Sequence, residues 1–304
     1  MAPDTSAVLL TRSEAGVDAA ALALAVPAEG GLPRVVWWGP AAQVTGASAA
    51  DVVAARRGLD GVQGLAVLPE HSTGSYTRPA LRGHRPAPAA GEDPAWSTAF
   101  VLDAVETGVQ VGGEDAAQTE RVVVTAVDDV AHLALRSEWE ALPGGLLRAR
   151  HTLTNTGAGS YALEGLEVLV PLPDEAAEVL DHTGGWLHAR VPQRAPVRDG
   201  LWLRENRTGK TGHDAAGDLV VGTPGFGFSA GEVRSASVGW SGNTVQRVER
   251  SPSSATTLGG GELLLPGEAT LAPGASYSTP WLYLGASADG LDGLAAANHA
   301  FLRA

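Results

Sequence analysis

Cysteine is absent from this chain of 304 residues, and lysine occurs once, at Lys210. Without cysteine the protein has no disulfide framework, no thiol nucleophile and no thiolate-ligated metal. Charged residues make up 18% of the chain, which is low for a helical protein, and aromatic residues make up 5%. No apolar run approaches the roughly 20 residues that a membrane-spanning helix needs. These absences disfavour a disulfide-rich, thiol-dependent or membrane-spanning protein.

The charge balance limits the expected partners. The formal net charge is −13, and phosphate binding needs a clustered basic surface, so neither nucleic acid nor an anionic membrane is expected as a partner. The segment Met1–Gly16 lacks a charged lead followed by an apolar run, so it indicates no secretory signal. We therefore expect a soluble cytoplasmic protein, long enough for one large domain or two ordinary ones.

Short apolar runs between turn residues dominate the sequence and predict strands. Arg121–Val127 and Ala131–Glu140 alternate in polarity, as half-buried strands do, and Leu146–Thr154 alternates apolar residues with arginine. The chain's 39 glycines and 19 prolines supply many turns. Further strands are predicted at Tyr161–Leu172, Leu219–Gly222, Gly225–Ser229, Val233–Trp240, Thr244–Glu249, Gly261–Leu265 and Ser276–Leu284.

Two segments have the pattern of helices. Ala47–Arg57 is rich in alanine and predicts a short helix inserted in a loop. Ser287–Ala304 predicts an amphipathic final helix. Many strands with few helical windows favour an all-β fold, a large antiparallel sandwich. The residues expected on the apolar face of the final helix are Leu291, Leu294, Ala295, Asn298 and Leu302.

The stretch Leu180–Ala215 combines aromatic and basic residues among glycines. It holds Trp186 and Trp202, several arginines, Lys210 and three histidines, with no long apolar run to bury them. Such a surface suits a sugar, whose C–H face packs on an indole while its hydroxyls take polar partners. The alternative is a long arginine-rich hairpin whose tryptophans cap the core. The residues by themselves leave both interpretations open.

Catalytic signatures are mostly missing. The sequence at 227–231 fits the GxSxG nucleophile pattern around Ser229, but that motif requires a strand, a turn and then a helix, whereas residues 232–240 continue as strand. A turn between strands is therefore favoured over a serine hydrolase. The histidines form no HxxxH or HExxH pair, so no metal site is expected. Glu138 with Glu140, and Asp128 with Asp129, are interpreted as strand-face and turn residues, and Gly259–Gly261 as a turn.

An ordered set of motifs resembles a known family. The set begins with Val35–Gly39 (VVWWG) and Leu68–Leu81 (LPEHSTGSYTRPAL) and ends with Tyr277–Leu294. Between these lie Thr183–Trp186 (TGGW), Pro192–Arg194 (PQR), Arg204–Asp214 (RENRTGKTGHD), Trp240–Asn243 (WSGN) and Gly260–Gly267 (GGELLLPG). Each piece is weak alone, but their order resembles the N-terminal region of glycoside hydrolase family 36, the bacterial α-galactosidases.

The resemblance implies a β-supersandwich that precedes a (β/α)8 barrel. In that family the barrel holds the aspartate nucleophile and the aspartate acid/base of a retaining mechanism, and nothing in this chain matches the barrel's motifs. The implied organisation is a supersandwich over residues 1–286 and a helix over 287–304 leading toward a barrel absent from this chain. The chain alone is therefore predicted to be inactive, with no catalytic residue of its own.

The resemblance assigns one substrate-binding residue, Trp186. The tryptophan of the family's TGxW motif lies on a loop that reaches a neighbouring subunit's active site. The family also places an Asp and an Arg of the sugar pocket between the Trp-Gly step and the Arg-Pro-Ala passage. In this sequence Asp51, Arg56, Arg57 and Asp60 fall in that window, and the local pattern assigns none of them.

The implied function is the N-terminal domain of an α-galactosidase, which shapes the substrate site and the oligomer. The expected partners are an α-galactoside such as melibiose or raffinose, the barrel, and further copies of the same enzyme. No cofactor is expected. A stand-alone carbohydrate-binding or assembly module without catalysis is the alternative. His213 and Asp214 fit the motif in either a binding role or a turn.

Overall fold

A computed structural model describes residues 5–12, 19–58, 61–74, 76–87, 93–111, 118–213 and 217–304. Most of the described strands join one 14-stranded sheet, which is antiparallel except where β1 meets β9 at Leu10 and Thr119. The chain order of these strands is β1 (Thr5–Thr11), β2 (Ala20–Pro27), β3 (Arg34–Pro40), β6 (Leu65–Ala66), β8 (Val101–Val111), β9 (Gln118–Asp128), β10 (Leu133–Ala141), β11 (Leu147–Asn155), β14 (Glu178–Gly185), β15 (His188–Pro196), β17 (Asp218–Gly222), β18 (Val233–Val238), β22 (Ser276–Ser278) and β23 (Leu282–Ser287).

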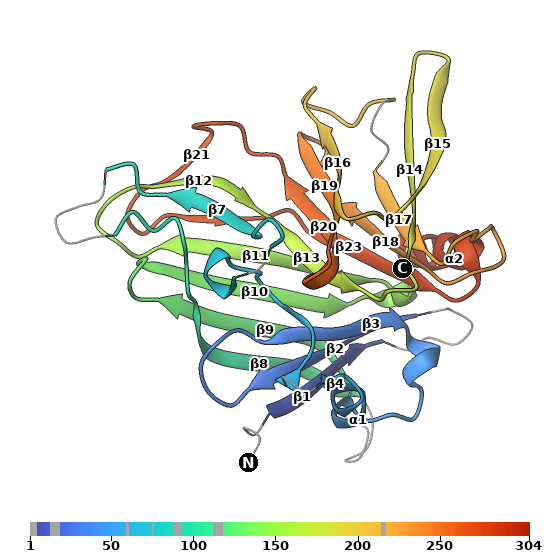
Figure 1. The fold of residues 1–304 in the computed structure, drawn as a ribbon, viewed down its shortest axis with the longest axis horizontal. Coiled ribbons are helices and arrows are strands. Elements are labelled where there is room, and N and C mark those ends of the chain that lie inside the picture. The colour runs from blue at the N-terminus through green and yellow to red at the C-terminus, as the bar shows by residue number, and fades with distance from the viewer. Residues whose placement is uncertain are drawn as a thin grey trace.

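Two smaller sheets lie against the large one and complete a sandwich (Figure 1). A four-stranded sheet has the order β13-β20-β19-β16, and a three-stranded sheet has the order β21-β12-β7. The all-β sandwich predicted from the sequence is confirmed. The strands of the small sheets are β7 (Leu81–His84), β12 (Tyr161–Leu166), β13 (Val168–Leu172), β16 (Gly200–Asn206), β19 (Thr244–Ser251), β20 (Ser254–Glu262) and β21 (Ala269–Leu271), and β4 (Arg57–Gly58) pairs with β5 (Gly61–Val62).

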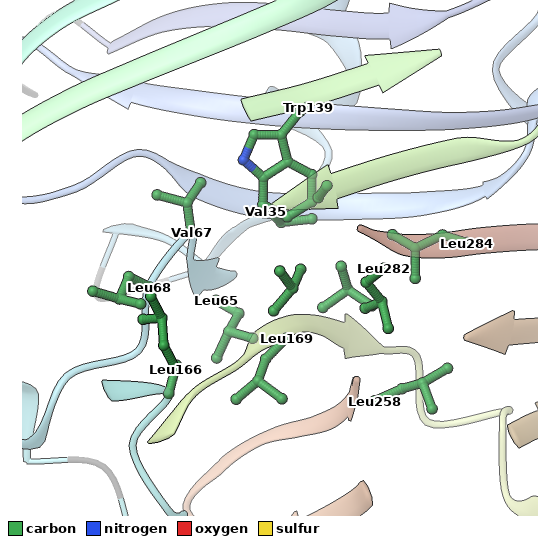
Figure 2. Close-up of a cluster of buried hydrophobic side chains, with 14 of the residues drawn as sticks. Val35, Leu65, Val67, Leu68, Trp139, Leu166, Leu169, Leu258, Leu282 and Leu284 are labelled. Atoms are coloured by element: carbon green, nitrogen blue, oxygen red, sulfur yellow. The ribbon is translucent and has the colours of Figure 1, made fainter. Parts of the chain in front are cut away.

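The main core fills the space between the layers. Trp139, Leu282 and Leu284 face it from the large sheet, and Leu169 and Leu258 face it from the four-stranded sheet (Figure 2). Alternating polarity produces this arrangement, because successive side chains of a strand point to opposite faces. Along β11 every second residue is buried, as the pattern of Leu146–Thr154 predicts. The hydrophobic burial of this cluster is the principal term that stabilises the fold.

A second, smaller core lies on the outer face of β1, β2 and β3. Helix α1 (Ala49–Ala54) covers that face with Val52 and Val53, which explains why seven of the eight residues of β2 are buried. Ser48 caps the helix: its Oγ accepts from the Asp51 amide at 3.2 Å, and Asp51 Oδ2 accepts from the Ser48 amide at 3.0 Å. The inserted helix predicted at Ala47–Arg57 is therefore present and shorter.

Helix α2 (Gly290–Arg303) packs beside β18 and β23 and follows the predicted final helix. Its buried face differs from the prediction, because Leu294 and Ala297 are buried while Ala295 and Leu302 are exposed. Gly144 lies so close beneath the last turn that a Cβ there would come within 2.2 Å of the Phe301 amide nitrogen. None of the helices in the described part of the chain is long and apolar enough to span a membrane.

Two predictions of local structure around glycines are wrong. Gly259–Gly261, predicted as a turn, lies inside β20, because a Cβ at Gly259 would come within 2.0 Å of the Val168 carbonyl oxygen and only glycine allows so close an approach. Gly225–Ser229, predicted as a strand, is a loop. Its Gly227 and Phe228 carbonyls accept from the first amides of α2 at 3.1 and 2.7 Å, which satisfies donors at that helix end.

Two other predicted strands are each divided. Tyr161–Leu172 forms β12 and β13, which belong to different sheets. Glu167 lies between them, 1% exposed, and its carboxylate accepts from Arg247 Nε at 2.8 Å. Ser276–Leu284 forms β22 and β23 with Pro280 between them. Because proline has no amide hydrogen for the ladder, pairing with β11 stops there and resumes at Leu282.

Candidate functional site

The stretch Leu180–Ala215 begins with a hairpin that leaves the body of the protein. Strands β14 and β15 form the edge of the large sheet and project beyond it as a two-stranded ribbon (Figure 1). The ribbon turns at Trp186 and Leu187, whose exposures are 81% and 83%. Trp186 is therefore presented to the outside and does not cap the core. The interpretation of this tryptophan as a surface residue is the one that the fold supports.

Tight backbone packing forms the turn at the tip. Gly184 packs so closely against β15 that a Cβ there would come within 2.0 Å of the His188 carbonyl oxygen, and Leu187 adopts the left-handed φ of 67°. The Trp186 indole meets the His213 imidazole edge to face, with centroids 6.4 Å apart and planes at 79°. His213 thus contacts the site tryptophan, while Asp214 lies outside the described residues.

The loop that carries His213 is hydrogen-bonded to a second motif of the sequence, Trp240–Asn243. Asn206 Nδ2 donates to the Lys210 carbonyl at 2.6 Å and to the Gly242 carbonyl at 3.1 Å. Asn243 Oδ1 accepts from the Gly209 amide at 2.8 Å. Two of the motifs from the sequence, RENRTGKTGHD and WSGN, are therefore bonded to each other and hold one loop cluster.

Trp240 forms one wall of a crevice beneath this loop cluster. A Cβ at Gly242 would come within 2.4 Å of the indole nitrogen, so only glycine fits beneath the ring. Asp181, His182 and Arg204 also line the crevice, whose volume is about 30 Å³. A space of this size holds about one water molecule and does not admit a sugar ring. Of the two tryptophans, Trp186 at the tip is 81% exposed and Trp240 is 46% exposed, so the larger open aromatic surface is at the tip.

A second polar pocket lies beside β3, and it could hardly be predicted from the sequence. Its volume is about 290 Å³, and Trp37 and Trp38 line it together with Arg56 and Gln63. The Arg56 and Gln63 side chains are exposed, and the tryptophans are mostly buried. Asp174 and Glu175 also line it, so the pocket offers hydrogen-bond donors and acceptors around an apolar floor. The Trp-Trp-Gly step was its one signal in the sequence.

Four residues between the Trp-Gly step and the Arg-Pro-Ala passage were left unassigned from the sequence, and they differ in their surroundings. Asp51 caps α1, where hydrogen bonds from Ser48 lower the pKa of its carboxyl. Arg56 lines the pocket beside Trp37. Arg57 lies in β4, and Asp60 is outside the described residues. Arg56 therefore lies at a pocket, and the helix cap explains Asp51 structurally.

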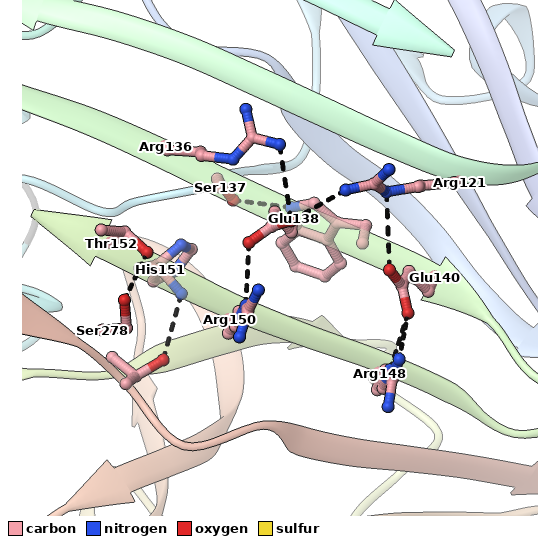
Figure 3. Close-up of polar contacts among 12 residues, drawn as sticks. Arg121, Arg136, Ser137, Glu138, Glu140, Arg148, Arg150, His151, Thr152 and Ser278 are labelled. Carbon is pink, nitrogen blue, oxygen red and sulfur yellow. Dashed lines mark hydrogen bonds and ion pairs between the residues drawn. The ribbon is translucent and has the colours of Figure 1, made fainter. Parts of the chain in front are cut away.

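The paired carboxylates of β10 are held by arginines. Glu138 Oε2 accepts from Arg150 Nε at 2.8 Å, and Oε1 accepts from Arg121 Nη2 at 3.0 Å (Figure 3). Glu140 accepts from Arg148 Nε at 2.7 Å. Burial acts to raise the pKa of Glu138, but the hydrogen bonds from Arg150 and Arg121 outweigh it and lower that pKa. Such a carboxylate stays ionised and is unsuited to act as a general acid.

Ser229 has neither the context nor the burial of a catalytic serine. It is exposed in the loop between β17 and β18, and a strand follows it where a nucleophile elbow requires a helix. The turn predicted for the GxSxG match is present, and its carbonyls accept from α2. In the described part of the chain, no group of three or more His, Asp or Glu residues could hold a metal ion.

Comparison with known proteins places these features in a family. Residues 31–272 match the glycosyl hydrolase family 36 N-terminal domain. The α-galactosidase of Escherichia coli is 34% identical over 274 residues, which cover 89% of this chain and 36% of that enzyme. This chain thus spans little more than a third of that relative's length.

Solved structures agree on the fold. The α-galactosidase from Lactobacillus brevis superposes with a TM-score of 0.77 at 18% identity, over 97% of this chain and 41% of that one. A variant of the GH36 α-galactosidase AgaA from Geobacillus stearothermophilus, in complex with stachyose, superposes with a TM-score of 0.73 at 18% identity, over 99% and 43%. With most of its length matched to the family's domain, this chain belongs to glycoside hydrolase family 36, whose N-terminal domain it comprises.

Proposed function

We propose that this chain is the substrate-shaping and oligomer-forming N-terminal domain of an α-galactosidase. It would act with a (β/α)8 barrel that carries the catalytic aspartates and hydrolyses terminal α-galactosides such as melibiose or raffinose by a retaining mechanism. Family membership supports the proposal, as does the difference in length from relatives named as α-galactosidases. A related enzyme from Geobacillus stearothermophilus was solved with raffinose.

The observation that carries the proposal is the exposure of Trp186. An indole that is 81% exposed at the tip of a projecting hairpin loses apolar contact with the protein and can regain it against a ligand. A pyranose ring offers such a face, and its hydroxyls can take the polar edge of His213, which contacts the indole. The tip would reach a neighbouring copy, because the hairpin points away from its own body (Figure 1).

Chemistry would remain with the barrel. A retaining glycosidase needs two carboxyl groups about 5 Å apart across the anomeric carbon. The glutamate pair on β10 is bonded to arginines and so is not available for that role. We expect the purified chain to give no hydrolysis of p-nitrophenyl-α-galactoside at high protein concentration. Turnover that copurifies with the chain would contradict the proposal that the catalytic carboxyl groups belong to the barrel.

Trp186 is tested in a chain joined to a catalytic barrel. Loss of a stacking wall removes about 0.5–1.5 kcal/mol, so Trp186→Ala should raise the KM for raffinose by roughly twofold to tenfold. Trp186→Phe keeps an aromatic face and is the matched control, with a smaller change expected. Unchanged kinetics in Trp186→Ala would remove this residue from the substrate site.

The alternative is a carbohydrate-binding or assembly module that works without a barrel. The polar pocket beside Trp37 and Arg56 is the observation that favours it, because its volume of about 290 Å³ could hold part of a sugar. Calorimetric titration of the isolated chain with galactose, melibiose and raffinose separates the two functions. Measurable affinity that is lost in Arg56→Ala would favour the module, and we propose the cytoplasm as the location in either case.

A further inference from the structure

The β14–β15 hairpin loses the support of the large sheet at one position. Strand β14 pairs with β17 through Glu178, Val179 and Leu180, and beyond Leu180 its partner among the described strands is β15 alone. A two-stranded ribbon is marginally stable in water by itself. The direction in which the ribbon leaves the sheet therefore depends on the contacts made where β17 ends.

Asp181 is the first residue beyond that point, and it is bonded across to another sheet. Its side chain is 3% exposed and forms an ion pair with Arg204 of β16. One carboxylate oxygen accepts from Trp202 Nε1 at 2.9 Å, and the other accepts from Arg204 Nη2 at 3.2 Å. Because β16 belongs to the four-stranded sheet, these bonds join the base of the ribbon to the opposite layer of the sandwich.

The same guanidinium also holds the second strand of the ribbon. Arg204 Nη2 donates to Gln193 Oε1 at 2.7 Å, and Gln193 is the register partner of Asp181 on β15. The Arg204 guanidinium in addition lies over the Trp202 ring, 5.5 Å from its centroid. One arginine of β16 is therefore bonded to both strands of the hairpin at the height where the ribbon leaves its sheet.

We infer that Asp181 and Arg204 are positioning residues, which set the angle of the hairpin and so place Trp186. The inference rests on the proposed function of that tryptophan. Trp186 lies five residues beyond Asp181, which corresponds to about 16 Å of extended strand. We call the contacts among Asp181, Arg204 and Gln193 the clamp. A pivot of roughly 15° at the clamp would therefore move the indole by about 4 Å, which is enough to remove it from a stacking contact.

The energetics of buried ion pairs agree with a geometric role. Removing a carboxylate from water costs much of what its pairing with an arginine returns, so a buried pair is weak evidence for stability. Its bonds to two strands and one indole instead define a single geometry. Removing one partner of such a pair is destabilising, but the Arg204 side chain is 32% exposed and keeps access to water. We therefore expect Asp181→Asn and Arg204→Lys to lose some stability yet remain folded, with a looser hairpin.

Fluorine NMR of this chain labelled with 5-fluorotryptophan tests the clamp directly. The chain has eight tryptophans, and Trp186→Phe assigns the resonance of the tip. In Asp181→Asn we expect the Trp186 resonance to shift and narrow. In a separate hydrogen–deuterium exchange measurement, the hairpin amides between Thr183 and Val191 should exchange at least tenfold faster than in the parent. The Trp202 resonance should shift as well, which reports that its bond to Asp181 has changed.

Matched variants separate the clamp from a general loss of charge or fold. Glu205→Gln removes the neighbouring ion pair of β16, in which Arg207 Nε lies 2.8 Å from Glu205, and should leave the Trp186 resonance unchanged. Arg204→Lys keeps the charge but lacks the planar fork through which arginine reaches Asp181 and Gln193 together, and should reproduce Asp181→Asn. A Trp186 resonance and hairpin exchange unaltered in both folded variants, Asp181→Asn and Arg204→Lys, would overturn the clamp.

A double-mutant cycle in a chain joined to a barrel tests whether the clamp acts through Trp186. We expect Asp181→Asn to raise the KM for raffinose about threefold with kcat unchanged, and to have no further effect when Trp186 is already alanine. An equal rise in KM in both backgrounds would contradict positioning through Trp186. If Trp186→Ala itself leaves KM unchanged, the proposed function fails, while the fluorine spectrum still decides the clamp.

Discussion

Trp139 and Trp186 show how differently the same side chain is used in two regions of this molecule. Trp139 on β10 is completely buried in the main core, and its indole nitrogen donates to Ser137 Oγ at 2.8 Å. Trp186 is 81% exposed at the tip of the hairpin and contacts His213 alone among the described aromatic rings. The first contributes its burial to the free energy of unfolding. The second keeps its apolar face available to a ligand.

The strands around the two residues differ in the same way, because those around Trp139 are packed and β15 beside Trp186 is exposed. On the outer face of β9, β10 and β11, carboxylates are bonded to arginines of neighbouring strands (Figure 3). Along β15 eight of the nine residues are exposed and one is partly buried. The sandwich therefore forms a stable platform, and the hairpin presents an exposed tryptophan at little cost in stability.

The largest expected effect is on the core side. Trp139→Ala removes a fully buried indole and leaves a cavity, so we expect the free energy of unfolding to fall by about 3–5 kcal/mol. Urea unfolding followed by circular dichroism measures the change. A loss below about 1 kcal/mol would mean that the core collapses around the missing ring and that Trp139 is not central to it.

The sequence allowed much of the platform to be predicted, because its strands alternate. Periodicity located β9, β10 and β11 to within a few residues. It failed at Gly259–Gly261, where the need for glycine comes from the backbones of two neighbouring strands. It also failed at Glu167, whose buried partner Arg247 is 80 positions away. In both cases the cause is a tertiary contact that no local pattern contains.

The residue types of the candidate site could be predicted from the sequence, but their arrangement in space could not. The mixture of tryptophan and arginine marked the stretch that contains the projecting hairpin, and motif resemblance selected Trp186 as the candidate residue. Its exposure could not be read from residues, because an indole on a hairpin can face either way. The bonds between Asp181 and Arg204 were missed, since these residues belong to strands of different sheets. The pocket beside Trp37 was missed because its lining comes from four distant segments.

A buried histidine gives the platform a dependence on pH. His151 of β11 is fully buried with no hydrogen bond to either ring nitrogen, and burial lowers the pKa of its imidazole to about 4. The unfolded chain takes up the proton near 6.5, so the stability that depends on neutral His151 is complete above that pH and is lost as pH falls toward 4. We expect the loss to reach about 3 kcal/mol.

His151→Leu isolates this contribution. The variant should unfold with a flatter dependence on pH between 6.5 and 4, and it should be more stable than the parent at the acid end. His188→Gln on the exposed hairpin is the control and should keep the parent's slope. Parallel curves for His151→Leu and the parent, measured by urea titration at several pH values, would contradict the assignment.

A buried glutamate, Glu70, gives the stability the opposite dependence on pH. Burial raises the pKa of Glu70 to about 7, although its carboxylate accepts from the Phe100 amide at 3.0 Å. The fold therefore favours protonated Glu70, and the associated stability is present below pH 4.5 and lost as pH rises through 7. Glu70→Gln should stabilise the protein at pH 8 by roughly 1–2 kcal/mol and have little effect at pH 4.

Thermal unfolding at the two pH values provides the measurement. Asp129→Asn, at an exposed turn position, is the matched control and should change neither midpoint appreciably. An equal shift of the Glu70→Gln midpoint at both pH values would show that the side chain acts through packing and not through its proton.

The smallest expected effect is on the hairpin side, and it completes the comparison with Trp139. Trp186→Ala removes an indole that is 81% exposed, so its area in contact with the protein is small and we expect the free energy of unfolding to change by no more than about 0.5 kcal/mol. The same urea titration that reports Trp139→Ala measures it. A loss above about 2 kcal/mol would place the indole against the body of the protein, or against a second copy whose dissociation precedes unfolding. Repeating the titration at a tenfold lower protein concentration separates these cases, because only a contact between copies makes the midpoint depend on concentration.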